Sequence, residues 1–222
     1  MALDGTYAGL QASIQEFLNR PDLASAIPTF ITLAENQINR RIRVADMMAS
    51  TTLSVSSAAT NLPSDFNGVV SFELPSGNAP LRYEKPEGLR AQRNLNYASA
   101  GTPFMWTIIG TTLETCPAPS GTFACQLVYY QRLPALSGSQ TTNWLLTKHP
   151  DIYLYGSLLQ TAPYLKDDAR LASWGQLYTA AIQDLLASDN RTAFGDGLQP
   201  PFRGANAPHG QDSPAPALPT PA

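Results

Sequence analysis

Histidine and paired aspartates are the residues of this chain best suited to acid–base chemistry. His149 stands two residues before Asp151, which could orient its imidazole, while His209 lies near the C-terminus without rigid surroundings. Asp167 and Asp168 resemble the carboxylate pair of a glycoside hydrolase. Adjacent residues at a helix start point apart, however, and aspartates there cap the helix and complement its dipole. We therefore expect His149 and the aspartates to serve helix starts, not catalysis.

Thiol and metal chemistry finds little support in the pattern. The chain lacks a phosphate-binding loop, G-x-S-x-G, H-E-x-x-H and C-x-x-C. Cys116 and Cys125 flank the segment "PAPSGTFA", which is typical of a hairpin turn, so the two thiols would face each other across two strands. A reducing compartment favours free thiols, with a disulfide or a metal as the weaker alternatives. We predict no enzyme activity, no metal and no cofactor.

One basic cluster, Arg40, Arg41 and Arg43, lies within "NRRIR". On a helix Arg40 and Arg43 would share a face, with Arg41 turned from them. The cluster is interpreted as a solvated face, as a partner for acidic residues of a neighbouring subunit, or as a surface that faces DNA.

Five large side chains recur at helical spacing between residues 153 and 178. This periodicity indicates packing within a helix bundle or between subunits more than a platform for stacking bases. They are Tyr153, Tyr155, Leu159, Trp174 and Tyr178.

Helices are expected at both ends of the folded region. Apolar spacing predicts helices over 6–19 and 27–48, and two more after Pro150, with a break at Pro163. Between them, Thr, Ser and Val alternate with turn residues in a β-meander that one short helix, near 86–94, interrupts.

The fold class is therefore α+β. We expect an antiparallel bundle of two N-terminal helices (1–49) and two C-terminal helices (135–191), with an inserted antiparallel β-rich region (50–134). A tail rich in proline, glycine and alanine (192–222) completes the chain. Such a tail suits extended binding to a partner, and its large apolar residues are the expected anchors. These are Phe194, Leu198 and Phe202.

The composition points to a subunit of an assembly. Of the 222 residues, 43% are hydrophobic and only 14% are charged, with a net charge of −3. This charge gives no global attraction for nucleic acid. No apolar run is long enough to span a membrane, and the first residues do not resemble a signal peptide, so we expect a soluble protein made in a cytoplasm.

One long segment resembles a known family. Residues 127–174, "LVYYQRLPALSGSQTTNWLLTKHPDIYLYGSLLQTAPYLKDDARLASW", are similar to the head-to-tail adaptors of tailed bacteriophages, especially the tail tubular protein A type of short-tailed phages. The preceding "PFMWTIIGTTLETCPAP" is also similar to that family. The chain departs from the pattern at Thr161, where alanine is expected.

The resemblance implies a structural virion protein. It implies a dodecameric ring between the portal and the tail nozzle or another neck protein, through whose lumen DNA passes without sequence-specific binding. The implied location is the neck or tail of the virion, with assembly in the host cytoplasm. A neck connector of a long-tailed or contractile phage is one alternative. A tail-associated peptidoglycan hydrolase, which would need a carboxyl of raised pKa in a cleft, is another.

Overall fold

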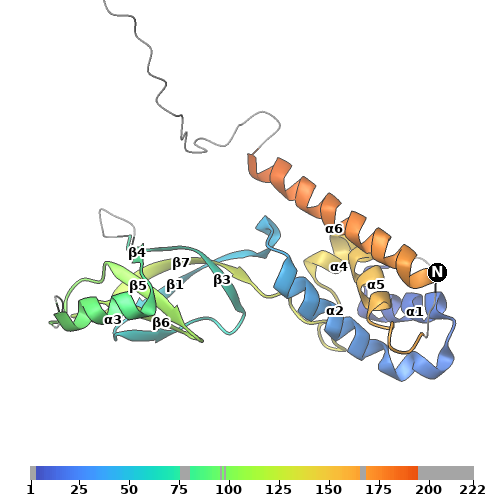
Figure 1. Ribbon diagram of the computed structural model, residues 1–222, viewed down its shortest axis with the longest axis horizontal. Helices are drawn as coiled ribbons and strands as arrows, with labels where there is room; N and C mark the ends of the chain where they lie inside the picture. Colours follow the sequence, from blue (N-terminus) through green and yellow to red (C-terminus); the bar gives the residue numbers. More distant parts are fainter. Residues whose placement is uncertain (1–3, 76–80, 96, 98, 166–168, 195–222) are drawn as a thin grey trace, which may run out of the picture.

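A computed structural model describes residues 4–75, 81–95, 97, 99–165 and 169–194. Figure 1 shows an elongated molecule with most of its helices gathered at one end and its sheets at the other. We refer to α1, α2, α4, α5 and α6 as the helical part, and to β1–β7 with α3 as the sheet part. The mixed α+β class is therefore confirmed.

The helices begin and end where local sequence dictates. The Thr6 hydroxyl accepts the Gly9 N–H at the start of α1, and Asn19 ends that helix in a left-handed conformation with φ of 50°. Pro28 and Pro150 occupy first-turn positions, where their missing N–H costs nothing. The helices are α1 (Tyr7–Leu18), η1 (Pro21–Ala26), α2 (Ile27–Arg41), α4 (Trp144–Lys148), α5 (Pro150–Leu159) and α6 (Arg170–Phe194).

Helix α5 is the centre of the helical core. It contacts α1, α2, α4 and α6, and Ile152, Tyr153 and Leu158 on it are fully buried. Gly156 lets α5 approach its neighbours, because a Cβ there would lie 3.1 Å from Tyr178 Cε2 and 3.6 Å from Ala34 Cβ. Helix α5 is mostly apolar around its circumference, as is typical of a helix that is covered by neighbours on several sides.

The sheet part contains two sheets. A three-stranded antiparallel sheet has the order β1-β7-β3, and a four-stranded sheet has the order β2-β6-β5-β4, in which β4 and β5 run parallel. Their strands are β1 (Met48–Val55), β2 (Ala59–Asn61), β3 (Phe66–Glu73), β4 (Arg82–Tyr83), β5 (Met105–Ile109), β6 (Thr112–Cys116) and β7 (Phe123–Gln131), and α3 spans Pro86–Leu95.

The two sheets share a second apolar core. Trp106 lies edge-on to Phe72, and its indole N–H donates to the Leu81 carbonyl at 3.0 Å. Leu89 of α3 packs on Met105 and Cys116 at the side of the four-stranded sheet. The helical and sheet parts therefore have separate cores, each with its own buried residues.

Several helix predictions need correction. The helix expected over 27–48 ends at Arg41, because the chain turns extended at Ile42 and forms a short 3-10 turn, η2 (Ala45–Met47). Helix α4, just before Pro150, was not predicted. The predicted break near Pro163 is confirmed, since α5 ends at Leu159.

The arrangement predicted for the cysteines is wrong. Cys116 ends β6 in one sheet and Cys125 lies on β7 in the other, so the segment between them crosses from sheet to sheet and does not form a hairpin. Both are free and fully buried, as the preference for free thiols predicted. Burial raises the pKa of both thiols.

Candidate functional site: the junction of the helical and sheet parts

A row of polar residues on α2 faces the place where the two parts meet. Glu35 and Asn39 are four residues apart and lie on one side of α2, and Arg43 follows two residues after the helix ends at Arg41. Glu35 and Asn39 accept N–H groups of the segment that leaves the sheet part, and Arg43 donates to the Asn67 carbonyl on β3. We call these three residues, together with Asn67, Asn143 and Tyr153, the junction.

Glu35 anchors the segment that leaves β7. Its Oε1 accepts the Leu136 N–H at 2.8 Å and the Tyr153 hydroxyl at 3.1 Å, although the residue is only 4% exposed. Burial raises the pKa of Glu35, and these two hydrogen bonds oppose the rise. Burial, and then the nearby Glu35 charge, raise the pKa of Tyr153. The carboxylate is thus a structural acceptor closed off from solvent.

Asn143 connects three elements. Its Oδ1 accepts the Leu146 N–H at 2.9 Å and so caps α4, while its Nδ2 donates to the Pro134 carbonyl at 2.9 Å and to the Tyr153 hydroxyl at 2.6 Å. Asn143 and Tyr153 both belong to the segment whose resemblance to phage adaptors the sequence displays. In the structure they hold helices α4 and α5 against α2.

The second half of the junction ties α2 to β3 and β7. Asn39 Oδ1 accepts the Leu133 N–H at 2.8 Å, and Asn67 Nδ2 donates to the Asn39 carbonyl at 2.9 Å. Arg43 donates to the carbonyls of Asn39 at 2.7 Å and Asn67 at 3.1 Å, and its guanidinium lies 6.0 Å from the Tyr130 ring centre. Arg43 therefore satisfies the open C-terminal carbonyls of α2 while it reaches the sheet part.

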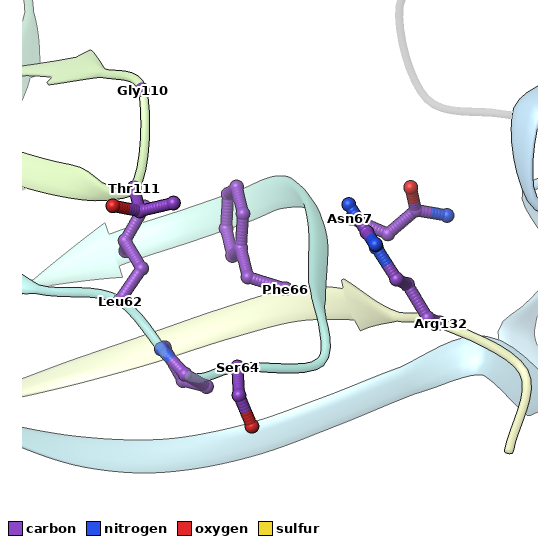
Figure 2. Close-up of a pocket in the computed structure, with 8 residues that line it drawn as sticks. Leu62, Ser64, Phe66, Asn67, Gly110, Thr111 and Arg132 are labelled. Carbon is purple, nitrogen blue, oxygen red and sulfur yellow. The ribbon is translucent and has the colours of Figure 1, made fainter.

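A cavity of about 270 Å³ opens beside the junction on the sheet side. Figure 2 shows the Phe66 ring standing between Leu62 and Thr111 on one side and Asn67 and Arg132 on the other. Asn67 thus contributes both to the junction and to this cavity.

The basic cluster divides in the structure. Arg40 and Arg41 are exposed, and Arg41 lines a shallow cavity of about 260 Å³ with Tyr178 and other residues of α6. Arg43 is half-buried in the junction, beyond the end of α2. Arg40 and Arg41 therefore remain the members that a neighbouring subunit or DNA could reach.

The predicted packing residues lie on α5 and α6. Tyr153, Trp174 and Tyr178 are buried in the helical core, and Tyr155 and Leu159 are half-buried against it. The Arg170 guanidinium lies 5.2 Å from the Trp174 ring centre. Phe194 is the last residue of α6, while Leu198 and Phe202 lie outside the described residues, as do Asp167, Asp168 and His209.

His149 occupies the joint between α4 and α5. It lines a cavity of about 150 Å³ in which Lys148 pairs with Asp46 at 2.8 Å and Asp189 accepts the Ala45 N–H at 2.8 Å. Within the part of the chain that the structure describes, no group of three or more His, Cys, Asp or Glu side chains could hold a metal ion. The same residues contain no helix long and apolar enough to cross a membrane.

The junction was not predicted, although one signal pointed to it. Glu35 falls beside Ile31, Ala34 and Ile38 in the apolar stripe of α2, and a carboxylate in such a stripe must find buried partners. Those partners, Leu136 and Tyr153, are more than 100 residues away in sequence, so only the fold identifies them.

Comparison with known families gives one result that covers most of the chain. A family model described as SU10 adaptor protein matches residues 5–201. A search of curated proteins finds no match. The matched region contains both the helical and the sheet part, together with the junction between them.

Proposed function

Since the chain belongs to the SU10 adaptor protein family, we propose that it is a structural virion protein that joins the head of a tailed bacteriophage to its tail. In this proposal it forms a dodecameric ring between the portal and the tail nozzle, and DNA passes through the lumen. The observation that carries the proposal is the family match over residues 5–201. The earlier resemblance to phage head-to-tail adaptors agrees with it.

The geometry of the junction supports a mechanical role. Both chain segments that connect the two parts, 42–47 and 132–143, lie at the junction. Buried hydrogen bonds with few alternatives hold a fixed geometry. A subunit of this shape can present its helical part to one partner and its sheet part to another without bending between them, and we propose that the bundled helices set the packing within the ring.

The proposed contacts extend to named residues. We assign Phe194, Leu198 and Phe202 as anchors of an extended tail on the portal or a neighbouring subunit, and the exposed Arg40 and Arg41 to a neighbouring subunit or the DNA-facing lumen. Half-buried Tyr155 and Leu159 are the packing residues that a second subunit could still reach. The protein would reside in the virion after assembly in the host cytoplasm.

No observation among the described residues favours the alternative function, a peptidoglycan hydrolase. Among the described residues, Glu35 is the carboxyl group whose pKa is raised, as a general acid would require. Its Oε1 is occupied by two donors and the residue is buried, so no substrate can reach it. A ring in the neck of a long-tailed or contractile phage, and not of a short-tailed one, stays an alternative within the adaptor class.

Assembly on capsids tests the proposal. DNA-filled capsids from a parent phage that lacks this gene would be mixed with purified protein and imaged by electron microscopy. We expect a twelve-fold ring on the portal, and micrographs of intact virions would identify the tail type. Absence of binding to portal-bearing capsids, or clearance of a peptidoglycan suspension by the protein, would contradict the proposal.

A further inference from the structure

Strand β1 has an open edge along its whole length. Its eight residues pair with β7 in one uninterrupted register, from Met48 opposite Tyr130 to Val55 opposite Phe123. On the other edge, no described residue pairs with the β1 backbone. Eight residues extend about 27 Å, so this edge offers a long row of unsatisfied N–H and C=O groups.

This edge lacks the features by which sheet proteins prevent pairing. Folded proteins protect edges with proline, charge, bulges or short strands. Strand β1, "MASTTLSV", contains no proline, glycine or charged residue. The opposite edge, β3, has two register irregularities and ends at Glu73, and the outer strands of the other sheet have only three and two residues. Among the edge strands that the structure describes, β1 and β3 are therefore the two long enough for extensive pairing.

The exposed surface of β1 is uncharged, and β3 carries one exposed charge, Glu73, at its end. Ser50, Thr52 and Ser54 are the exposed polar residues of β1, and the first two hydrogen-bond to Gln126 of β7. Each open edge also exposes an apolar side chain, Met48 at 43% on β1 and Val70 at 45% on β3. A second copy of this chain thus brings no like charge against β1 and covers apolar surface at both edges.

We propose that the open edge of β1 pairs with the open edge of β3 in a neighbouring copy of this chain, so that adjacent subunits share a continuous sheet. Strands β1 and β3 both run antiparallel to β7 and hence parallel to each other. When two copies of the chain are related by rotation about a ring axis, β1 of one copy would pair in parallel with β3 of the next copy. Such a contact uses two different surfaces, as closure into a ring requires. The inference rests on the proposed ring and identifies a contact between its subunits.

Cysteine pairs test the contact directly. One variant would carry Thr52→Cys with Ser71→Cys, and two others would replace the second change by Val70→Cys or Glu73→Cys to sample neighbouring registers. Within one chain Thr52 and Glu73 lie opposite the same β7 residue, Gln126, about 9–10 Å apart, and Ser71 and Val70 are farther away along the strand, so no pair can form a disulfide within the chain. The native thiols of Cys116 and Cys125 are fully buried, so we expect them to form no disulfide between subunits. Oxidation of capsid-bound protein should give a ladder of covalent multimers from at least one pair and only monomer from each single variant.

Other outcomes overturn the inference in distinguishable ways. Covalent dimers from Thr52→Cys alone would show two-fold pairing of β1 with itself. Capsid-bound protein that gives no multimer from any pair would reject the edge contact and leave the adaptor function standing. Failure of the unaltered protein to bind capsids would remove the proposed function and the ring contact together.

A charge variant gives an independent measurement. Thr52→Lys places a charge on the exposed face of β1, and Thr29→Lys on the exposed side of α2 is the matched control. We expect at least tenfold weaker retention on capsids for Thr52→Lys and unchanged retention for the control, with equal melting temperatures. Equal retention of the two variants would argue against the contact.

Discussion

Removal of one hydroxyl group should show how strongly the junction holds the fold. In Tyr153→Phe, Glu35 loses the donor at 3.1 Å and Asn143 loses the acceptor at 2.6 Å, while the aromatic ring keeps its packing. Glu35 keeps the Leu136 N–H, and Asn143 keeps the Pro134 carbonyl and its cap on α4. The variant therefore isolates the hydrogen bonds of a fully buried phenol from its apolar contacts.

The expected loss of stability follows from Glu35 and Asn143, the two hydrogen-bond partners that the Tyr153 hydroxyl leaves behind. A hydrogen bond to a charged group contributes about 1.5–3 kcal/mol, and a buried amide N–H without a partner costs about 1 kcal/mol more. The free energy of unfolding should therefore fall by about 2–4 kcal/mol, a large share of the 5–15 kcal/mol typical of a domain.

The loss should depend on pH because Glu35 titrates. Its pKa in the folded protein is raised above the ordinary 4.5, so the ionised carboxyl destabilises the fold at high pH, and this penalty disappears as pH falls toward 4.5. The Tyr153 hydrogen bond lowers that pKa, so it stabilises the ionised form most. We expect the effect of Tyr153→Phe to be larger at about pH 8 than near pH 5.

Urea denaturation followed by far-UV circular dichroism measures both effects. Tyr155→Phe is the matched control, since Tyr155 lies on the same helix, is half-buried and has no hydrogen bond from its hydroxyl within the described part of the chain. The control should change stability by less than about 0.5 kcal/mol. A loss below about 1 kcal/mol for Tyr153→Phe, or equal losses for both variants, would refute the reasoning.

Four further predictions concern other parts of the molecule. Glu35→Gln keeps an acceptor oxygen without a buried charge and should change the unfolding free energy by less than about 1 kcal/mol at pH 8, as urea midpoints would show. Gly156→Ala should destabilise by about 1–3 kcal/mol through its 3.1 Å contact, whereas Gly175→Ala, whose nearest neighbour is at 3.9 Å, should be neutral or stabilising in thermal melts. His149→Ala should leave infectivity of the phage intact; loss of infectivity in a folded, assembled variant would restore a chemical role. Deletion of 195–222 should leave the melting temperature unchanged but weaken retention on capsids in salt washes, and equal retention would reject Leu198 and Phe202 as anchors.

Local sequence patterns predicted the elements whose signals are local. The spacing of Leu10 and Ile14, the Thr6 cap and the first-turn Pro150 each specify a helix within a few residues, and the structure places helices there. The end of α2 was missed because the apolar stripe continues through Ile42, where the chain is extended and Arg43 bonds both to the Asn39 carbonyl of the helix and to the Asn67 carbonyl on β3.

The relations between distant segments could not be read from the sequence. The segment after Cys116 has the composition of a hairpin turn, yet it joins two different sheets, because the strand partners of β7 are β1 and β3. The junction was missed for the same reason, since Glu35 and Asn39 meet partners about a hundred residues away. The resemblance predicted the family from the very segment that contains Asn143 and Tyr153, without indicating what these residues hold together.

The pairing of β1 with β7 has a consequence for how such proteins can diversify. Met48, where the chain enters the sheet part, lies opposite Tyr130, where it leaves, so the two ends of the insert are neighbours on adjacent strands. Cα atoms of residues opposite each other in antiparallel strands are only about 4.5–5.5 Å apart. An insert with adjoining ends can be shortened, enlarged or exchanged for another module without moving the scaffold that carries it. The helical part can thus keep its fold while the size of the sheet part changes.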